Sequence, residues 1–436
     1  MNIGNYILLI FLCLLQLHPS TGQETECLPE WPGFRGYANS GTWHTDLKPD
    51  TLTSAHFKKI WEVPVKPGYS GPTMSDNKVF VMDYDRETSK ERVLCFHEES
   101  GEKLWEYDYP VDYASVGYPT GPRASAVVEG KLAFSFGTMG ELHCFDASSG
   151  EVQWEINTRE VYNSSIPIWG LAASPVIEGD LVIVQVGGVP DACLVAFNKF
   201  TGKEVWRALS DKASYSTPII IEQGEKKVLV IWTGENIAGL DPYSGKVYWK
   251  IPFETRKMIM NVASPVWSPP YLFLTAFFDG SFLLKLNPER PEAELLWRKT
   301  GRNERETIAL HSTISTPVIK EGYVYGIDSH GEVRCLDLLT GERIWEDLSL
   351  VREGRWSNIH FIPQDEKVWA FNETGELIYG EFTPAKFRNF GRIKLIDPVM
   401  LSPNPRKGVC WAIPAFYGNR IIVRNDEIMI CYEIGE

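Results

Sequence analysis

One short pattern recurs along the chain at intervals of 43 to 52 residues, and it limits the possible folds more than any other feature. Its clearest copy is LHCFDASSGEVQW, which ends at Trp154, and VRCLDLLTGERIW has the same register and ends at Trp345. The remaining tryptophans of this series are Trp61, Trp105, Trp206, Trp249 and Trp297. Self-similarity of this period is typical of folds that are built from one repeated supersecondary unit.

Each repeat also has an upstream half, which is clearest in AASPVIEGDLVIVQV, ISTPVIKEGYVYGI and AIPAFYGNRIIVRN. These segments alternate in polarity, Gly or Pro interrupts every run, and helical spacing is absent, so the pattern indicates short strands and turns. Four antiparallel strands per repeat are typical of one blade of a β-propeller. We therefore predict an all-β chain that folds as an eight-bladed β-propeller of four-stranded antiparallel blades.

The two ends of the repeat region predict how the ring closes. The last unit, at residues 411–433, has only three strands, whereas the segment that ends near Trp61 has only the fourth strand of a unit. We expect residues 54–63 to pair beside residues 428–434, which closes the ring and removes its exposed edges. The propeller then spans residues 54–436, after an N-terminal arm at 23–53, and seven blades is the alternative count.

The residues that recur in the repeat are predicted to be structural. The carboxylate of Asp146 can accept hydrogen bonds from the backbone two or three residues on, and Gly150 suits a turn. Trp154 can pack against the next blade and bury about 200 Å². Asp241, Asp337 and Gly341 repeat the same turn. An aspartate that recurs in most blades is not a unique catalytic site.

The cysteines follow the same repeat. Cys95, Cys144, Cys335 and Cys431 share one register, which Ala196 and Gly239 fill in other blades. This position is predicted to require a small buried side chain, a role that free cysteine can fill. The pattern assigns no role to Cys27, Cys193 or Cys410, and a bridge from Cys27 to the propeller is one alternative. No CxxC or CxxCH is present, so we expect neither a zinc site nor a c-type haem, and we predict no metal site.

Charge and the N-terminus restrict the location and the partners. The formal net charge of −14 and the absence of a Lys/Arg run argue against a nucleic-acid partner. The apolar run from Tyr6 to Leu17 is too short to span a bilayer comfortably, and Ser20 and Gly22 follow it as small residues. We predict a signal peptide at 1–22 and a secreted or periplasmic monomer without a transmembrane span. An N-terminal anchor is the alternative.

The repeat, written [LV]xCxDxxTGxxxW, resembles the pyrroloquinoline quinone (PQQ) type of propeller repeat from about Trp31 to Glu436. The segment WPGFRG at Trp31 to Gly36 is similar to the opening of secreted bacterial members of this PQQ-binding-like, quinoprotein-type group. The resemblance implies the propeller fold. It is compatible with two kinds of function, because fold does not determine function.

The first kind is a quinoprotein dehydrogenase that oxidises alcohols or sugars with PQQ and Ca²⁺. Members of that kind carry a vicinal disulfide, Glu, Asn and Asp ligands for Ca²⁺ and an aspartate base, and no segment of this chain matches those motifs. The second kind resembles the outer-membrane assembly scaffold lipoprotein, a non-catalytic propeller that binds peptide segments. The cysteine of a lipid anchor is missing here.

A binding site is predicted in the loops that lead into the innermost strands, because these loops meet at one rim of a propeller. Each blade contributes one candidate, and the set is Tyr69, Arg123, Trp169, Tyr215, Asn261, His311, Trp356 and Trp411. Such residues suit a polar ligand with apolar faces, such as a sugar or a quinone. The alternative is that they cap the core and contact water. His311 has no carboxylate partner that can be identified from the sequence, so a role as a general base has no support there.

These observations predict a secreted, non-catalytic propeller that serves as a binding or protein-interaction scaffold, without a cofactor. Its partner is a protein or a polysaccharide. One alternative is a PQQ- and calcium-dependent oxidoreductase with unusual site residues. A further alternative is a carbohydrate-binding module that uses the aromatic rings of the rim.

Overall fold

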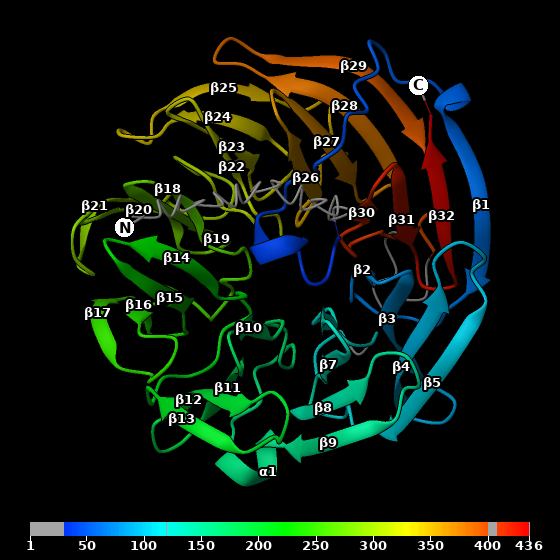
Figure 1. Cartoon of the computed structure of the whole chain (residues 1–436). Helices are drawn as coiled ribbons and strands as arrows, with labels where there is room; N and C mark the ends of the chain where they lie inside the picture. Colours follow the sequence, from blue (N-terminus) through cyan, green and yellow to red (C-terminus); the bar gives the residue numbers. More distant parts are fainter. Residues whose placement is uncertain (1–29, 119, 400–407, 436) are drawn as a thin grey trace, which may run out of the picture.

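The computed structural model describes residues 30–118, 120–399 and 408–435 of the chain. Within them, eight four-stranded antiparallel sheets surround a central axis, which confirms the eight-bladed propeller (Figure 1). The described helices are short: α1 (Thr158–Tyr162) and the 3-10 turns η1 (Tyr37–Asn39) and η2 (Ser54–His56). Cys27 and the expected signal peptide lie outside the described residues.

The first four blades follow one another along the chain, each from its innermost to its outermost strand. Blade 1 is β2 (Thr73–Ser75), β3 (Lys78–Asp85), β4 (Lys90–His97) and β5 (Lys103–Pro110). Blade 2 is β6 (Val127–Glu129), β7 (Leu132–Phe136), β8 (Glu141–Asp146) and β9 (Val152–Asn157). Blade 3 is β10 (Val176–Glu178), β11 (Leu181–Gly188), β12 (Ala192–Asn198) and β13 (Glu204–Ala208). Blade 4 is β14 (Ile219–Gln223), β15 (Lys226–Trp232), β16 (Asn236–Leu240) and β17 (Val247–Pro252).

The next three blades repeat this order, and the eighth is shared between the two ends of the chain. Blade 5 is β18 (Val266–Ser268), β19 (Tyr271–Ala276), β20 (Gly280–Leu286) and β21 (Ala293–Lys299). Blade 6 is β22 (Val318–Lys320), β23 (Tyr323–Ile327), β24 (Val333–Asp337) and β25 (Arg343–Asp347). Blade 7 is β26 (Ile359–Gln364), β27 (Lys367–Asn372), β28 (Glu376–Phe382) and β29 (Phe387–Lys394). Blade 8 is β30 (Ala415–Tyr417), β31 (Arg420–Arg424), β32 (Ile428–Ile434) and β1 (Phe57–Pro64).

The N-terminal strand closes the ring as predicted. β1 pairs antiparallel with β32, from Phe57 opposite Ile434 to Pro64 opposite Ile428. The strand begins three residues later than expected, because residues 54–56 form η2. Since the outermost strand of blade 8 comes from the other end of the chain, this pairing holds the first and last blades together.

The repeat tryptophans join neighbouring blades. The indole Nε1 of Trp105, on β5, donates a 3.1 Å hydrogen bond to the carbonyl of Ala147 in blade 2. The same bond to the next blade is made by Trp61, Trp154, Trp206, Trp297 and Trp345. Trp249 instead donates to Oε1 of Gln223 in its own blade. The Gln223 amide in turn binds three carbonyls in the rebuilt blade 5 turn at residues 287–292, so it replaces the direct bond.

The shared cysteine register is explained by these tryptophans. Cys95 lies opposite Trp105, and Cys144 lies opposite Trp154, each at a bulge in the strand pair. Gly239 lies opposite Trp249, where an added Cβ would come within 2.3 Å of the indole ring. The side chain at this position is therefore small because the indole ring of the opposite tryptophan lies over it. The six cysteines among the described residues are all buried and free.

The aspartate of the repeat stabilises the turn between the third and fourth strands. Oδ1 of Asp146 accepts hydrogen bonds from the backbone of Ser148 at 3.0 Å and of Ser149 at 2.9 Å. These bonds lower the pKa of Asp146, the bond from Ser149 most strongly. The side chain lies at the exposed end of the blade, which agrees with a structural role.

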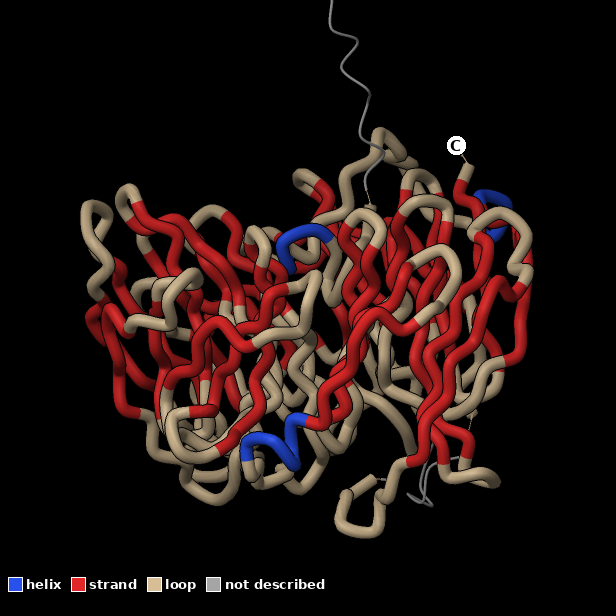
Figure 2. The backbone as a smooth tube through the Cα atoms, turned by 60° about the horizontal axis from the view of Figure 1, so that its bottom comes forward, coloured by secondary structure: helices blue, strands red, loops and turns tan. Residues whose placement is uncertain are grey.

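The N-terminal arm crosses the ring on the side opposite to α1 (Figure 2). It begins against blade 1, where Trp31 pairs with Met74, and its Asn39 side chain bonds to the carbonyl of Pro218 in blade 4. The backbone of Trp43 then binds Pro363 in blade 7, so η1 lies near the centre of the ring (Figure 1). The arm therefore covers one end of the axis.

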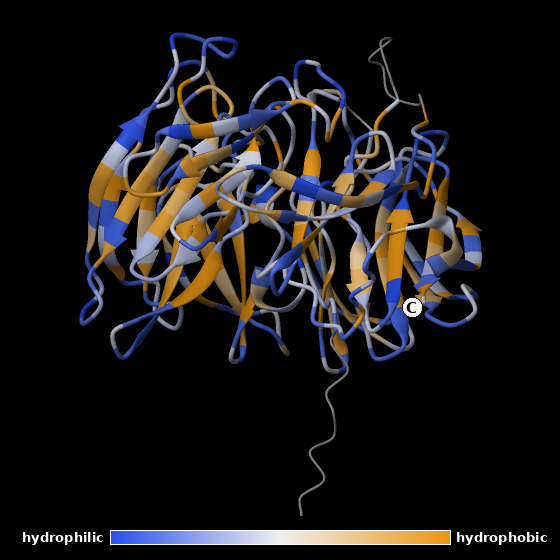
Figure 3. Cartoon of the chain, turned by 90° about the horizontal axis from the view of Figure 1, so that it is seen from above, coloured by the Kyte–Doolittle hydropathy of each residue, from blue (hydrophilic) through white to orange (hydrophobic). Residues whose placement is uncertain are grey.

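Hydrophobic residues are concentrated along the strands, and hydrophilic residues are concentrated in the loops at both ends (Figure 3). This distribution follows from burial of the sheets against one another, because each blade covers the face of the next. Among the described ranges, no helix is long and apolar enough to cross a membrane.

Candidate functional site

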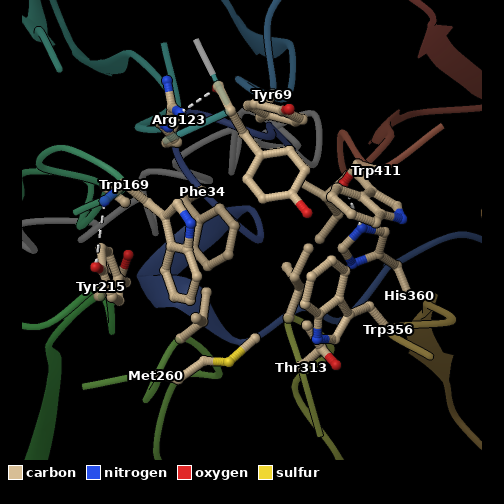
Figure 4. Close-up of a pocket in the computed structure, with 16 residues that line it drawn as sticks. Phe34, Tyr69, Arg123, Trp169, Tyr215, Met260, Thr313, Trp356, His360 and Trp411 are labelled. Carbon is tan, nitrogen blue, oxygen red and sulfur yellow. Dashed lines mark hydrogen bonds between the residues drawn. The ribbon is translucent and has the colours of Figure 1, made fainter. Parts of the chain in front are cut away.

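The axis of the ring contains a pocket that opens among the loops leading into the innermost strands (Figure 4). Its volume is about 150 Å³, and every one of the eight blades contributes a lining residue. The arm supplies Phe34, which lines the pocket together with the blades. Because the same order of strands and turns is repeated in each blade, eight equivalent loops meet around the axis.

Six of the eight predicted residues line this pocket: Tyr69, Arg123, Trp169, Tyr215, Trp356 and Trp411. The other two lie behind the wall. Asn261 is fully buried and its side-chain amide donates to the carbonyl of Thr233 at 2.9 Å. The ring of His311 lies between the amide of Gly301 and the carbonyl of Phe277, and burial lowers its pKa. Both residues stabilise loops.

The sequence interpretation missed several lining residues. Phe34, Tyr118, Met260, Thr313 and His360 all line the pocket. Met260 and Thr313 lie one and two positions from the predicted Asn261 and His311, so the loops were identified correctly but the wrong side chains were chosen. The WPGFRG segment could have indicated Phe34, because an aromatic residue between glycines is unusual in an exposed arm.

Aromatic rings form most of the wall. The rings of Trp169 and Tyr215 are 5.3 Å apart, and those of Tyr69 and Trp411 are 6.0 Å apart. Tyr118 of blade 2 meets Trp356 of blade 7 edge to face at 5.9 Å, which connects two sides of the pocket that are not adjacent around the ring. Figure 4 shows Trp169, Trp356 and Trp411 arranged around one space. Such rings present flat apolar faces to a ligand.

Arg123 holds one loop of the wall. Its guanidinium donates to the carbonyls of Gly117 at 3.0 Å and Tyr118 at 2.6 Å, and also to Gly121. It packs 5.2 Å from the ring centre of Tyr69. No ion pair to Arg123 occurs among the described residues, so backbone carbonyls are what hold its guanidinium. Three of its five N–H donors are used in this way.

The remaining polar groups of the pocket are few. Nε2 of His360 donates to the carbonyl of Trp411 at 2.8 Å, and burial lowers the pKa of this histidine to about 4, so the ring is neutral at pH 7. The buried Arg35 of the arm adds to this lowering through its positive charge. Burial lowers the pKa of Arg35 itself to about 10. Arg35 and Arg123 thus lie at the pocket, while Glu373 lies behind its wall and accepts a 3.2 Å hydrogen bond from Nε1 of Trp411.

The lining does not fit a calcium-bound quinone. Ca²⁺ requires several carboxylate or amide oxygens around one point, and no Asp, Glu, Asn or Gln lines the pocket. Within the described residues there is no group of three or more His, Cys, Asp and Glu side chains that could hold a metal. The chain also has no adjacent cysteines for a vicinal disulfide. We therefore derive no reaction step through PQQ.

The repeat, the eight blades and the axial pocket together define a β-propeller of the PQQ-like repeat class. Residues 89–347, more than half of the chain, match the family of the outer membrane protein assembly factor BamB, and the chain belongs to this family.

The similar proteins agree with this assignment. BamB of Yersinia pestis is 23% identical over 224 residues, which covers 49% of this chain and 53% of that protein, so the match spans about half of the relative. The structure of BamB from Moraxella catarrhalis has a TM-score of 0.58 at 14% identity and covers 87% of this chain and 100% of that one.

The quinohemoprotein alcohol dehydrogenase of Comamonas testosteroni has a TM-score of 0.64 at 12% identity and covers 93% of this chain and 81% of that one. At these identities, likeness to the solved structures concerns the fold alone.

Proposed function

We propose that this chain is a non-catalytic binding propeller that acts as an interaction scaffold outside the cytoplasm. The observation that carries the proposal is the composition of the axial pocket. Its walls are aromatic and aliphatic, and its only imidazole, that of His360, is bonded to a backbone carbonyl and neutral at pH 7. Such a pocket can hold a ligand or a side chain by apolar contact, but it offers no general base near its ordinary pKa.

The family supports the same role. The matching family is that of an outer membrane protein assembly factor, and the fold-level likeness to an alcohol dehydrogenase carries no site residues with it. The proposal that the chain is exported depends on the apolar run and the small residues at 1–22.

The test of the non-catalytic role is a dye-linked oxidation assay. Purified protein is incubated with PQQ and Ca²⁺ and then offered primary alcohols and aldoses, with a PQQ dehydrogenase as the positive control. We expect no turnover above the protein-free blank. Turnover that depends on both PQQ and Ca²⁺ would overturn the proposal and favour the oxidoreductase alternative.

Export is tested separately. Residues 1–22 are fused to a phosphatase that is active only outside the cytoplasm, beside the same fusion in which Leu8, Leu9 and Ile10 are replaced by Asp. We expect activity from the first fusion alone, because the apolar run is the export signal. Equal activity from the two fusions would contradict the assignment.

A further inference from the structure

The axial pocket has room for about one aromatic ring. Its volume is about 150 Å³, and an apolar cavity of roughly 150 Å³ is known to hold benzene. The flat faces of Trp169, Trp356 and Trp411 line it, so a planar ring gains contact on several sides (Figure 4). Size and shape therefore favour a six-membered ring over a long chain.

Two of the residues that line the pocket each carry a buried polar group without a hydrogen-bond partner. These groups are the hydroxyl of Thr313, a residue that is 4% exposed, and the indole Nε1 of Trp356. They come from neighbouring blades, whose loops are joined by a 2.5 Å bond from the Ser315 hydroxyl to Asn358 Oδ1. A buried polar group without a partner costs free energy. A ligand oxygen that reached either group would accept a hydrogen bond from it and remove that cost.

Charge restricts the ligand further. No carboxylate lines the pocket, while Arg123 lines it and the buried Arg35 lies close enough to His360 to lower its pKa. The positive charge of Arg123 at the wall favours an electron-rich oxygen over an amine. A sugar ring would bring several hydroxyls against a mostly aromatic and aliphatic wall, and each hydroxyl left without a partner would lose its hydration.

Two aromatic residues of the pocket wall have an unusual backbone conformation. Tyr118 and Trp356, whose rings meet in the pocket wall, both have positive φ angles, of 52° and 68°. Bulky residues rarely adopt this conformation, and residues held in it cluster at binding sites. The strain thus fixes two aromatic faces where an incoming ring would lie.

We propose that the axial pocket binds one oxygen-bearing aromatic ring of the phenol type, with its oxygen at Thr313 and Trp356. The ring is either a free phenolic compound or a tyrosine side chain of a partner segment. The proposal rests on the binding role proposed above and names the ligand class of that site.

The test compares p-cresol, toluene and glucose by calorimetry and by saturation-transfer NMR on the full chain. We expect p-cresol to bind, toluene to bind roughly two- to tenfold more weakly because it lacks the oxygen, and glucose not to compete. Equal affinity for p-cresol and toluene, or a preference for glucose, would overturn the proposal. Failure of p-cresol to bind overturns this inference without affecting the oxidation assay, which tests the non-catalytic role separately.

Thr313→Val is the diagnostic variant, because it removes the hydroxyl and keeps the shape. We expect its affinity for p-cresol to fall to that for toluene, whereas its melting temperature should not fall, since the lost hydroxyl had no partner. Thr73→Val is the matched control: Thr73 is also fully buried with an unpartnered hydroxyl, but it does not line the pocket. If Thr313→Val is unstable, Trp356→Phe removes the indole N–H instead. Unchanged p-cresol affinity in the folded variant contradicts the proposal.

The two sources of the ring are separated with the capped peptide Gly-Tyr-Gly. Displacement of p-cresol by this peptide, but not by Gly-Ala-Gly, supports a tyrosine of a partner. Binding of p-cresol without displacement by the peptide supports a free phenolic compound.

Discussion

The contact between Trp105 and Gly150 gives a quantitative test of how the blades are joined. Gly150 has φ of +74°, and a Cβ added there would lie 2.6 Å from Cδ2 of the Trp105 ring. Gly150→Ala therefore combines two costs. The left-handed backbone costs about 1 kcal/mol for a residue with a side chain, and the overlap with the ring costs about 2 kcal/mol, as overpacking does. We expect a total loss of about 3 kcal/mol.

Trp105→Ala removes a side chain that is 8% exposed, together with its hydrogen bond to Ala147. We expect it to lower the free energy of unfolding by about 4 kcal/mol. In the double variant the ring that the new methyl group would strike is gone, so only the backbone cost of about 1 kcal/mol is added. The double variant should lose about 5 kcal/mol, which is about 2 kcal/mol less than the sum of the single losses.

The measurement is a double-mutant cycle from urea unfolding at one pH, with Gly322→Ala as the control. Gly322 has a similar φ of +81°, but no atom lies within 4 Å of a Cβ added there, so it reports the backbone cost alone. Additive losses from Trp105→Ala and Gly150→Ala would refute the reasoning, because they would mean that the ring does not press on the glycine.

Three further predictions concern other parts of the ring. Burial, and then the charge of Glu91, raises the pKa of Glu141 to about 7, above its usual value near 4.5, so the folded state binds the proton more tightly. Stability should therefore fall as pH rises from about 4.5 to 7, and Glu141→Gln should remove this slope and stabilise the protein by about 2 to 4 kcal/mol at pH 8 in urea unfolding. Trp43→Ala, which empties a 1% exposed position of the arm, should lose about 3 to 5 kcal/mol in the same assay. Trp169→Ala should lose less than about 1 kcal/mol, because this ring is only partly buried at the pocket, yet it should weaken p-cresol binding in calorimetry. A loss at Trp169 as large as that at Trp105 would show that the pocket ring belongs to the core.

The fold could be predicted from the repeat because each unit contains the residues that shape its own blade. The Asp–Gly turn, the tryptophan and the small residue opposite it act within one blade and its neighbour, and sequence spacing records such short-range relations. Closure by residues 57–64 could be predicted for a related reason, since a unit with three strands needs a fourth to cover its edge.

The site was predictable only to the level of loops. Loops before the innermost strands must converge on the axis, and this rule identified six lining residues correctly. It could not decide which side chain of a loop turns inward. Asn261 and His311 turn away because each satisfies a backbone group inside the wall, and that depends on neighbours from other blades.

The sequence by itself determined the eight blades, the antiparallel strands and the joining of the ring, because these depend on contacts that repeat with a fixed period. Only the tertiary structure decided that the arm crosses the axis, with Phe34 in the pocket. It also decided that the hydroxyl of Thr313 and the indole of Trp356 lie buried on neighbouring loops without partners. These features occur once and join residues far apart in the chain, so no periodicity records them.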